Sequence, residues 1–235
     1  MTVIQAEYHQ HHRDVTGGWL RPAVFGVMDG LVSNGALIAG VAGGGGDTRT
    51  IVLTGLAGLV AGACSMATGE YTSVASQSEL TRAEIARERR ELAIRPAEEQ
   101  AELAAVYRAR GLDPELADQV AEQLSRDPAH ALQVHVREEL GVDPDDLPSP
   151  LVAAGSSFAA FALGAFVPVL PFLIGLGSLT VALVLTAVAL FAAGAAVAKL
   201  TAVSLWFGGL RQLGLAAFAA AVTYGIGHLI GASLS

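Results

Sequence analysis

The chain has 235 residues, of which 52% are apolar, and its mean hydropathy is +0.50. A net charge of −8 argues against nucleic-acid binding, which needs a basic surface, and a single cysteine excludes an internal disulfide framework or a cysteine zinc cluster. Most of the 14 basic and 22 acidic side chains lie between Glu79 and Asp146. We therefore predict a membrane domain that is interrupted by one soluble, acidic insert.

Two apolar segments precede the insert. The first runs from Pro22 to Gly46 with Asp29 as its only charge. The second runs from Ile51 to Gly69 and is followed directly by Glu70. A helix crosses the hydrocarbon core of a bilayer with about 20 residues, so each segment is predicted to span the membrane.

Three further spans are predicted after the insert. The stretch from Leu151 to Ala198 carries no charged side chain and is long enough for two helices and a turn. The break between these two helices is expected at Pro168, Pro171, Gly175 and Gly177. The last span is predicted from Gln212 to Leu234. The predicted fold is thus an all-α membrane protein with five transmembrane helices and a cytoplasmic helical insert.

Basic residues near the span ends indicate the orientation, because they are retained on the cytoplasmic side. With five spans, Arg49 falls alone on one side of the membrane. The other side receives Arg13, Arg21, Arg82, Arg87, Arg89, Arg90, Arg137, Lys199 and Arg211. The N-terminus and the insert are therefore predicted to be cytoplasmic, and the C-terminus external.

The insert is predicted to be helical throughout. Span two is expected to continue as a helix to about Ala93, because this stretch lacks proline. Three more helices, each with a proline in the first turn, are predicted at Pro96–Arg110, Pro114–Ser125 and Pro128–Leu140, with stops at Gly111 and Gly141. The predicted domains are residues 1–75 (tail and spans one and two), 76–148 (metal-binding insert) and 149–235 (spans three to five).

Asp29 lies inside the first span, where a charge costs at least a few kcal/mol. A role as ion ligand or proton carrier would explain that cost. Pairing with a neighbouring helix is the alternative, but the other spans carry no lysine or arginine in their interiors. Met66 and Glu70 lie one helical turn apart, and a thioether beside a carboxylate suits a transition metal better than Ca²⁺ or Mg²⁺. Neutral oxygen ligands could come from Ser33, Asn34 and Ser65.

Carboxylates recur at helical spacing in the insert. The candidate ligands form three groups: Glu84, Glu88 and Glu91; Glu99 and Glu102; and His135 with Glu138 and Glu139. Carboxylates on facing helices, together with a histidine, can form an inward-pointing metal site. A solvated surface with Glu–Arg pairs is the alternative that spacing alone leaves open.

Three motifs resemble those of the vacuolar iron transporter family, and the resemblance covers nearly the whole chain. They are residues 29–33 (DGLVS), residues 61–67 (AGACSMA) running into residues 69–71 (GEY), and residues 138–141 (EELG). The resemblance implies a homodimer of five-helix protomers with the ion path at the subunit interface. It also implies export of Fe(II), and often Mn(II), from the cytoplasm in exchange for protons.

The resemblance further implies two metal sites. The membrane site corresponds to Asp29 and Met66, with Glu70 near the cytoplasmic mouth. The cytoplasmic site corresponds to Glu88, Glu91, Glu99, Glu102 and Glu139. Where the family has methionines before the last glutamate, this chain has His135 and Val136, and a histidine can still ligate iron or zinc.

The sequence thus predicts a proton-coupled exporter of Fe(II), with Mn(II) as a second cargo and Zn(II) as a further ion that the insert could bind. A bacterial plasma membrane is the expected location, and no enzyme motif or prosthetic group is expected. One alternative is a membrane-bound iron sensor or storage protein that binds metal without transporting it. Another is a structural membrane oligomer with a solvated insert. His9, His11 and His12 could scavenge metal, although a mobile tail is the simpler interpretation.

Overall fold

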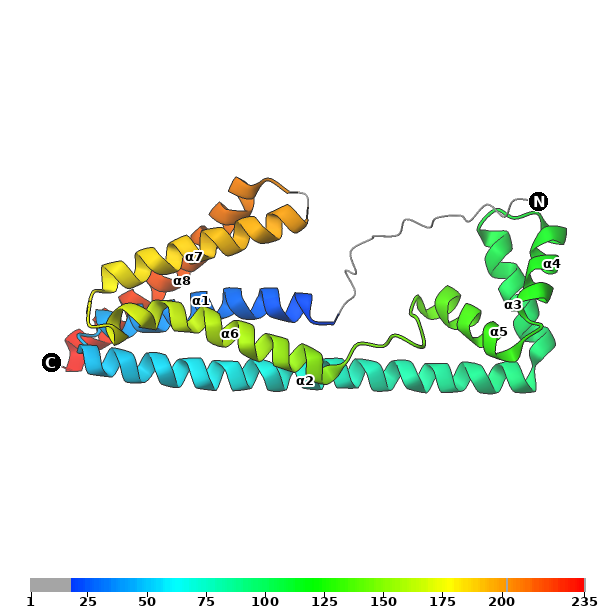
Figure 1. Cartoon of the computed structure of the whole chain (residues 1–235), viewed down its shortest axis with the longest axis horizontal. Helices are drawn as coiled ribbons and strands as arrows, with labels where there is room; N and C mark the ends of the chain where they lie inside the picture. Colours follow the sequence, from blue (N-terminus) through cyan, green and yellow to red (C-terminus); the bar gives the residue numbers. More distant parts are fainter. Residues whose placement is uncertain (1–17, 202, 235) are drawn as a thin grey trace, which may run out of the picture. The chain divides into compact units, whose positions relative to one another are not determined.

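The computed structural model describes residues 18–201 and 203–234, and all regular structure within these ranges is helical (Figure 1). The predicted all-α class is therefore confirmed for this part of the chain. His9, His11 and His12 lie outside the described residues. The described chain divides into a first unit, which ends at Glu70 and resumes at Leu151, and a second unit, Tyr71–Pro150.

Within the described residues, five helices are long and apolar enough to cross a membrane, which confirms the predicted number of spans. They are α1 (Leu20–Gly43), α2 (Thr48–Ile94), α6 (Pro150–Leu173), α7 (Leu179–Leu200) and α8 (Leu205–Leu234). The N-terminal half of α2 is apolar and belongs to the first unit, whereas its charged C-terminal half belongs to the second. No proline occurs in α2, and the helix is continuous between the two halves.

The turn between α6 and α7 differs from the prediction. Pro168 and Pro171 lie inside α6 and are buried, and only Gly175 and Gly177 mark the break. These glycines have φ of +82° and +52°, a backbone conformation that side chains disfavour. Membrane helices tolerate internal proline because neighbouring helices can satisfy the freed backbone groups. The prediction that these prolines end a helix is therefore wrong.

The start of the last span also differs from the prediction. α8 begins at Leu205, well before the predicted Gln212, so Arg211 lies inside the helix. The Arg211 guanidinium lies 5.9 Å from the centre of the Phe207 ring, one turn earlier in α8. Arginine is a good helix former, so the helix can continue through a charge that the sequence pattern had placed in a loop.

Glycines bring the backbone of α1 into direct contact with α6 and α8. A Cβ atom added at Gly30 would collide with the backbone of Phe161 and Ala165 on α6. One added at Gly227 on α8 would collide with the carbonyl group of Gly40 on α1. Small residues are typical of such close helix pairs in membranes, because packing rather than the hydrophobic effect holds the helices together.

Gly227→Ala is expected to destabilise the protein by about 2–3 kcal/mol, because the methyl group would push α8 away from the Gly40 carbonyl. Gly225→Ala is the matched control, since a Cβ there meets nothing within 4 Å. Thermal unfolding of the detergent-solubilised protein measures both. Equal melting temperatures for the two variants would contradict the close packing of α1 and α8.

The second unit consists of the C-terminal half of α2 and of α3 (Pro96–Ala109), α4 (Pro114–Leu124), α5 (Pro128–His135) and the π-helical turn η1 (Val136–Leu140). Each of α3, α4 and α5 begins with proline, as predicted. The Asp113 and Asp127 side chains accept hydrogen bonds from the first-turn amides of α4 and α5. Gly111 and Gly141 adopt positive φ where α3 and η1 end.

Two small apolar clusters hold these helices together. Ile85 of α2 packs with Leu132 and Val136, and Leu103 of α3 packs with Ala104 and Ala121. The predicted single helix over residues 128–140 changes to a π-helical turn after His135. Such turns often occur at functional sites in helices.

Candidate metal sites

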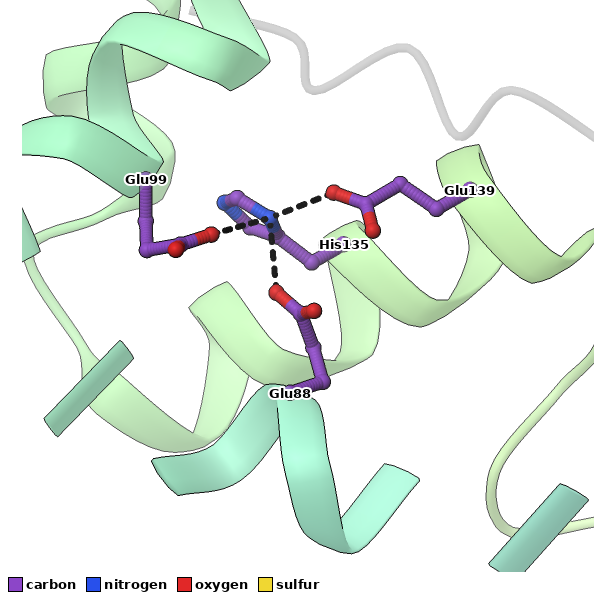
Figure 2. Close-up of side chains that lie close together, drawn as sticks. All are labelled: Glu88, Glu99, His135 and Glu139. Carbon is purple, nitrogen blue, oxygen red and sulfur yellow. Dashed lines mark hydrogen bonds and ion pairs between the residues drawn. The ribbon is translucent and has the colours of Figure 1, made fainter. Parts of the chain in front are cut away.

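One histidine and three glutamates of the second unit converge on a single point (Figure 2). The Nδ1 atom of His135 lies 3.1 Å from a carboxylate oxygen of Glu88, 3.1 Å from one of Glu139 and 3.9 Å from one of Glu99. Glu88 comes from α2, Glu99 from α3, His135 from α5 and Glu139 from η1. Four separate elements of the unit thus supply this group, which we call the His135 cluster.

The His135 cluster is largely shielded from solvent. His135 is 0% exposed, Glu88 8% and Glu99 7%, while Glu139 lies at the rim. The four potential ligand atoms all lie within 4.8 Å of one another. Ligand atoms bound to one zinc-like ion lie about 3–4 Å apart, so small side-chain movements would bring this set to bonding distance. The cluster could therefore hold a metal ion.

The electrostatics of the His135 cluster favour a cation. Burial, and then the charge of Glu139, raise the pKa of Glu88 to about 7, although His135 partly offsets this rise. Burial, and then the charge of Glu102, also raise the pKa of Glu99. The carboxylates therefore repel one another when they are ionised, and a bound divalent ion would relieve that repulsion.

Hydrogen bonding leaves polar atoms of the His135 cluster unsatisfied. The ring nitrogen Nδ1 is hydrogen-bonded to Glu139, and a single N–H group can serve only one acceptor well. The nearby Glu88 oxygen and the His135 Nε2 atom are buried without a hydrogen-bond partner among the described residues. A metal ion could bind several of these oxygens at once, which a single N–H group cannot do.

Two other predicted ligands of the insert lie beside the His135 cluster and not within it. Glu91 and Glu102 line the same cavity of about 360 Å³ as Glu88 and Glu99. Glu91 also pairs with Arg87 at 3.1 Å. These two glutamates could therefore supply additional charge at the entrance, without belonging to the His135 cluster.

Glu138 does not join the His135 cluster, although it is adjacent in sequence to Glu139. Its carboxylate forms an ion pair with Arg110 and accepts a hydrogen bond of 3.3 Å from the Tyr107 hydroxyl. Its negative charge is thereby already neutralised by a cation. The predicted pairing of His135 with both glutamates is thus found for Glu139 alone.

The first unit contains a polar groove between α1 and α2. Asp29, Ser33 and Asn34 of α1 face Ser65 and Met66 of α2 across a volume of about 250 Å³. We call this space the Asp29 groove, and its other lining residues are Leu37, Gly58, Gly62 and Phe161. A carboxylate, a thioether and neutral oxygens thus share one groove within apolar helices, a ligand set that suits a transition metal.

Two features of this groove were not specified by the sequence. Glu70 does not line it, but lies in another cavity with Arg21 and the apolar residues Val24 and Met28. Phe161 of α6 packs against Met66 at one side of the groove and was not identified from the sequence. Its contact is long-range, so no local pattern could have revealed it.

A family model described as the VIT family matches residues 20–228. A vacuolar iron transporter of Acanthamoeba castellanii is 37% identical over 91% of this chain and 79% of its own length. Vacuolar iron transporter homolog 3 of Arabidopsis thaliana is 33% identical over 91% of this chain and 84% of its own. Vacuolar iron transporter 1 of the same plant is 30% identical, over 80% and 76% respectively. The family match includes both the five spans and the insert.

Proposed function

Since the chain belongs to the VIT family, we propose that it exports divalent transition metal ions, chiefly Fe(II) and also Mn(II), from the cytoplasm. The observation that carries this proposal is the Asp29 groove, which a carboxylate and the Met66 thioether both line within membrane-spanning helices. An ionisable group in such a place costs free energy, and a function would explain why that cost is tolerated. A carboxylate with a thioether suits a borderline or soft divalent ion.

In the proposed mechanism, the insert first captures the cytoplasmic ion. The His135 cluster provides three carboxylates and an imidazole, and Glu91 and Glu102 add negative charge along the same cavity. Such a set would also accept Zn(II). We propose that Glu138 is not a ligand, because Arg110 neutralises it.

Asp29 is then the residue that couples metal to protons. Its carboxylate binds the ion only when it is deprotonated, so protons arriving from the far side would compete for the same oxygens and release the metal. Glu70, which lies in the neighbouring cavity of the same unit, is proposed to act at the cytoplasmic mouth. The basic residues near the span ends support a cytoplasmic N-terminus and insert.

A homodimer with the groove at its interface would solve a solvation problem. Ser33 is exposed and Asp29 is only half-buried in the single chain. In a bilayer, Asp29 and the Ser33 hydroxyl, which donates its hydrogen bond to the Asp29 carbonyl oxygen, would face hydrocarbon, where an uncompensated carboxylate is strongly disfavoured. A second copy packed across the groove would shield them.

We propose a bacterial plasma membrane as the location.

Metal uptake into proteoliposomes with an imposed pH gradient tests the proposed function. Fe(II) should accumulate in the vesicles, and faster when the lumen is more acidic than the outside, because protons then leave as the metal enters. Collapsing the gradient with a proton ionophore should slow uptake to the rate without a gradient. Binding of Fe(II) without accumulation would instead support the sensor or storage alternative.

A further inference from the structure

Asn34 occupies an unusual position at one end of the Asp29 groove. It is 2% exposed and yet lines the groove. Its amide nitrogen donates two hydrogen bonds, one of 3.1 Å to the Gly55 carbonyl of α2 and one of 2.6 Å to the Ala165 carbonyl of α6. The side chain is thus held between three membrane helices.

These two bonds fix the orientation of the Asn34 amide. Both partners are acceptors, so the NH₂ group must face them, and a flipped amide would place its oxygen against two carbonyl oxygens. The oxygen Oδ1 is therefore directed away from Gly55 and Ala165. It is buried and has no hydrogen-bond partner among the described residues. Buried carbonyl oxygens normally have a partner, so this one calls for an explanation.

Gly58 leaves space next to this oxygen. A Cβ atom at Gly58 would lie 2.9 Å from Asn34 Oδ1 and 2.7 Å from Cδ2 of Leu37. Gly58 and Leu37 both line the groove, so Oδ1, although buried, lies directly behind this part of the groove wall. Asn34 follows Asp29 by five residues, which places it about 7.5 Å further along α1.

We propose that Asn34 Oδ1 is a neutral ligand for the divalent metal ion in transit, at a second position beyond Asp29 and Met66. The inference rests on the proposed transport function and extends it to a further residue. A carbonyl oxygen can replace a water of the hydrated ion without adding charge. Conduction needs sites that bind weakly enough to release the ion, and a neutral ligand after the Asp29 carboxylate meets that need.

Two substitutions test this role from opposite directions. Gly58→Ala retains the Asn34 amide and both of its acceptors, but places a methyl group so close to Oδ1 that the oxygen must shift or be covered. Asn34→Ala removes the oxygen and enlarges the groove. If Oδ1 is a ligand, each variant should lower kcat/KM for Fe(II) uptake into proteoliposomes by about tenfold or more. Gly214→Ala on α8 is the control, since a Cβ there meets nothing within 4 Å, and its uptake should equal that of the wild type.

The other outcomes overturn the inference in recognisable ways. If the width of the groove alone limits the rate of transport, Asn34→Ala will transport as fast as the wild type or faster. If Asn34 only links helices, Asn34→Ala will melt at a lower temperature, while Gly58→Ala transports normally. If the wild type takes up Fe(II) normally, either of these two results rejects only the role of Asn34 as a ligand. If the wild type takes up no Fe(II), the proposed transport function is rejected as well.

Discussion

Asp29→Asn is expected to lower Fe(II) uptake into proteoliposomes by about 100-fold or more, while the protein still folds. Asparagine has nearly the same shape as aspartate but cannot carry the negative charge or the exchangeable proton that the proposed mechanism requires. The metal would lose its charged ligand in the Asp29 groove, and protons could no longer compete for it. Initial rates of uptake, with and without a pH gradient, measure the effect.

Asp47→Asn is a matched control for this substitution. Asp47 lies immediately before α2, where its side chain accepts a hydrogen bond of 2.8 Å from the Thr50 amide. Asparagine caps helices about as well as aspartate, so this variant should transport normally. Normal uptake by Asp29→Asn, at the rate of Asp47→Asn, would reject the proposed role of Asp29. Similar melting temperatures for both variants would exclude misfolding as the cause of a loss.

Glu88→Gln is expected to lower the affinity of the insert for Mn(II) by about 10–100-fold at pH 8 and to weaken its pH dependence. The pKa of Glu88 is raised to about 7, mainly by burial. In the wild type, protons therefore compete with the metal below pH 7, and affinity should fall by up to about tenfold per pH unit as pH decreases. Glutamine cannot be protonated in this range, so the contribution of Glu88 to the pH dependence of the affinity disappears.

Calorimetric titration of the full-length protein measures this effect, with Asp29→Asn in every sample to disable the membrane groove. Glu122→Gln is the control, since Glu122 is exposed and pairs with Arg126 at the surface, at 3.4 Å. Its affinity and pH slope should match those of the parent. An unchanged pH slope in Glu88→Gln would show that Glu88 does not give up a proton when the metal binds.

The same pKa shift predicts how the metal-free insert responds to pH. The carboxyl group of Glu88 binds a proton more tightly in the folded protein than in the unfolded chain, whose ordinary value is 4.5. Between pH 4.5 and about 7 the folded state therefore holds more protons, so its stability falls as pH rises through this window. Metal binding above pH 7 would restore what deprotonation removes.

Local signals in the sequence predicted most of the helices correctly. Apolar length identified the five spans, and proline at the first turn identified the starts of α3, α4 and α5. These signals depend only on neighbouring residues, so they can be read without tertiary structure. Pro168 and Pro171 misled the prediction because their tolerance inside α6 depends on packing against other helices.

The candidate sites show the same limit. Spacing placed Glu138 and Glu139 equally close to His135, but η1 and the position of Arg110 separate them. Met66 and Glu70 share a helix face by spacing, yet they line different cavities, Met66 with Asp29 and Glu70 with Arg21. The roles of Asn34 and Phe161 depend on contacts with α2 and α6 that no local pattern specifies.

The glycine contacts of α1 determine which wall of the Asp29 groove can move. α1 meets α6 and α8 backbone to backbone, at Gly30 and Gly40, and such contacts leave no side chain to rearrange. The glycines of α2 instead face side chains, with Gly58 against Leu37 and Asn34, and Gly62 against the ring of Phe161. Side chains can change rotamer as one helix shifts past another, whereas backbone atoms in direct contact have no such freedom. In a transport cycle, α1 would thus keep its place against α6 and α8 and hold Asp29 fixed, whereas α2, which carries Met66, is joined to α1 through side chains, including the Asn34 hydrogen bond to the Gly55 carbonyl.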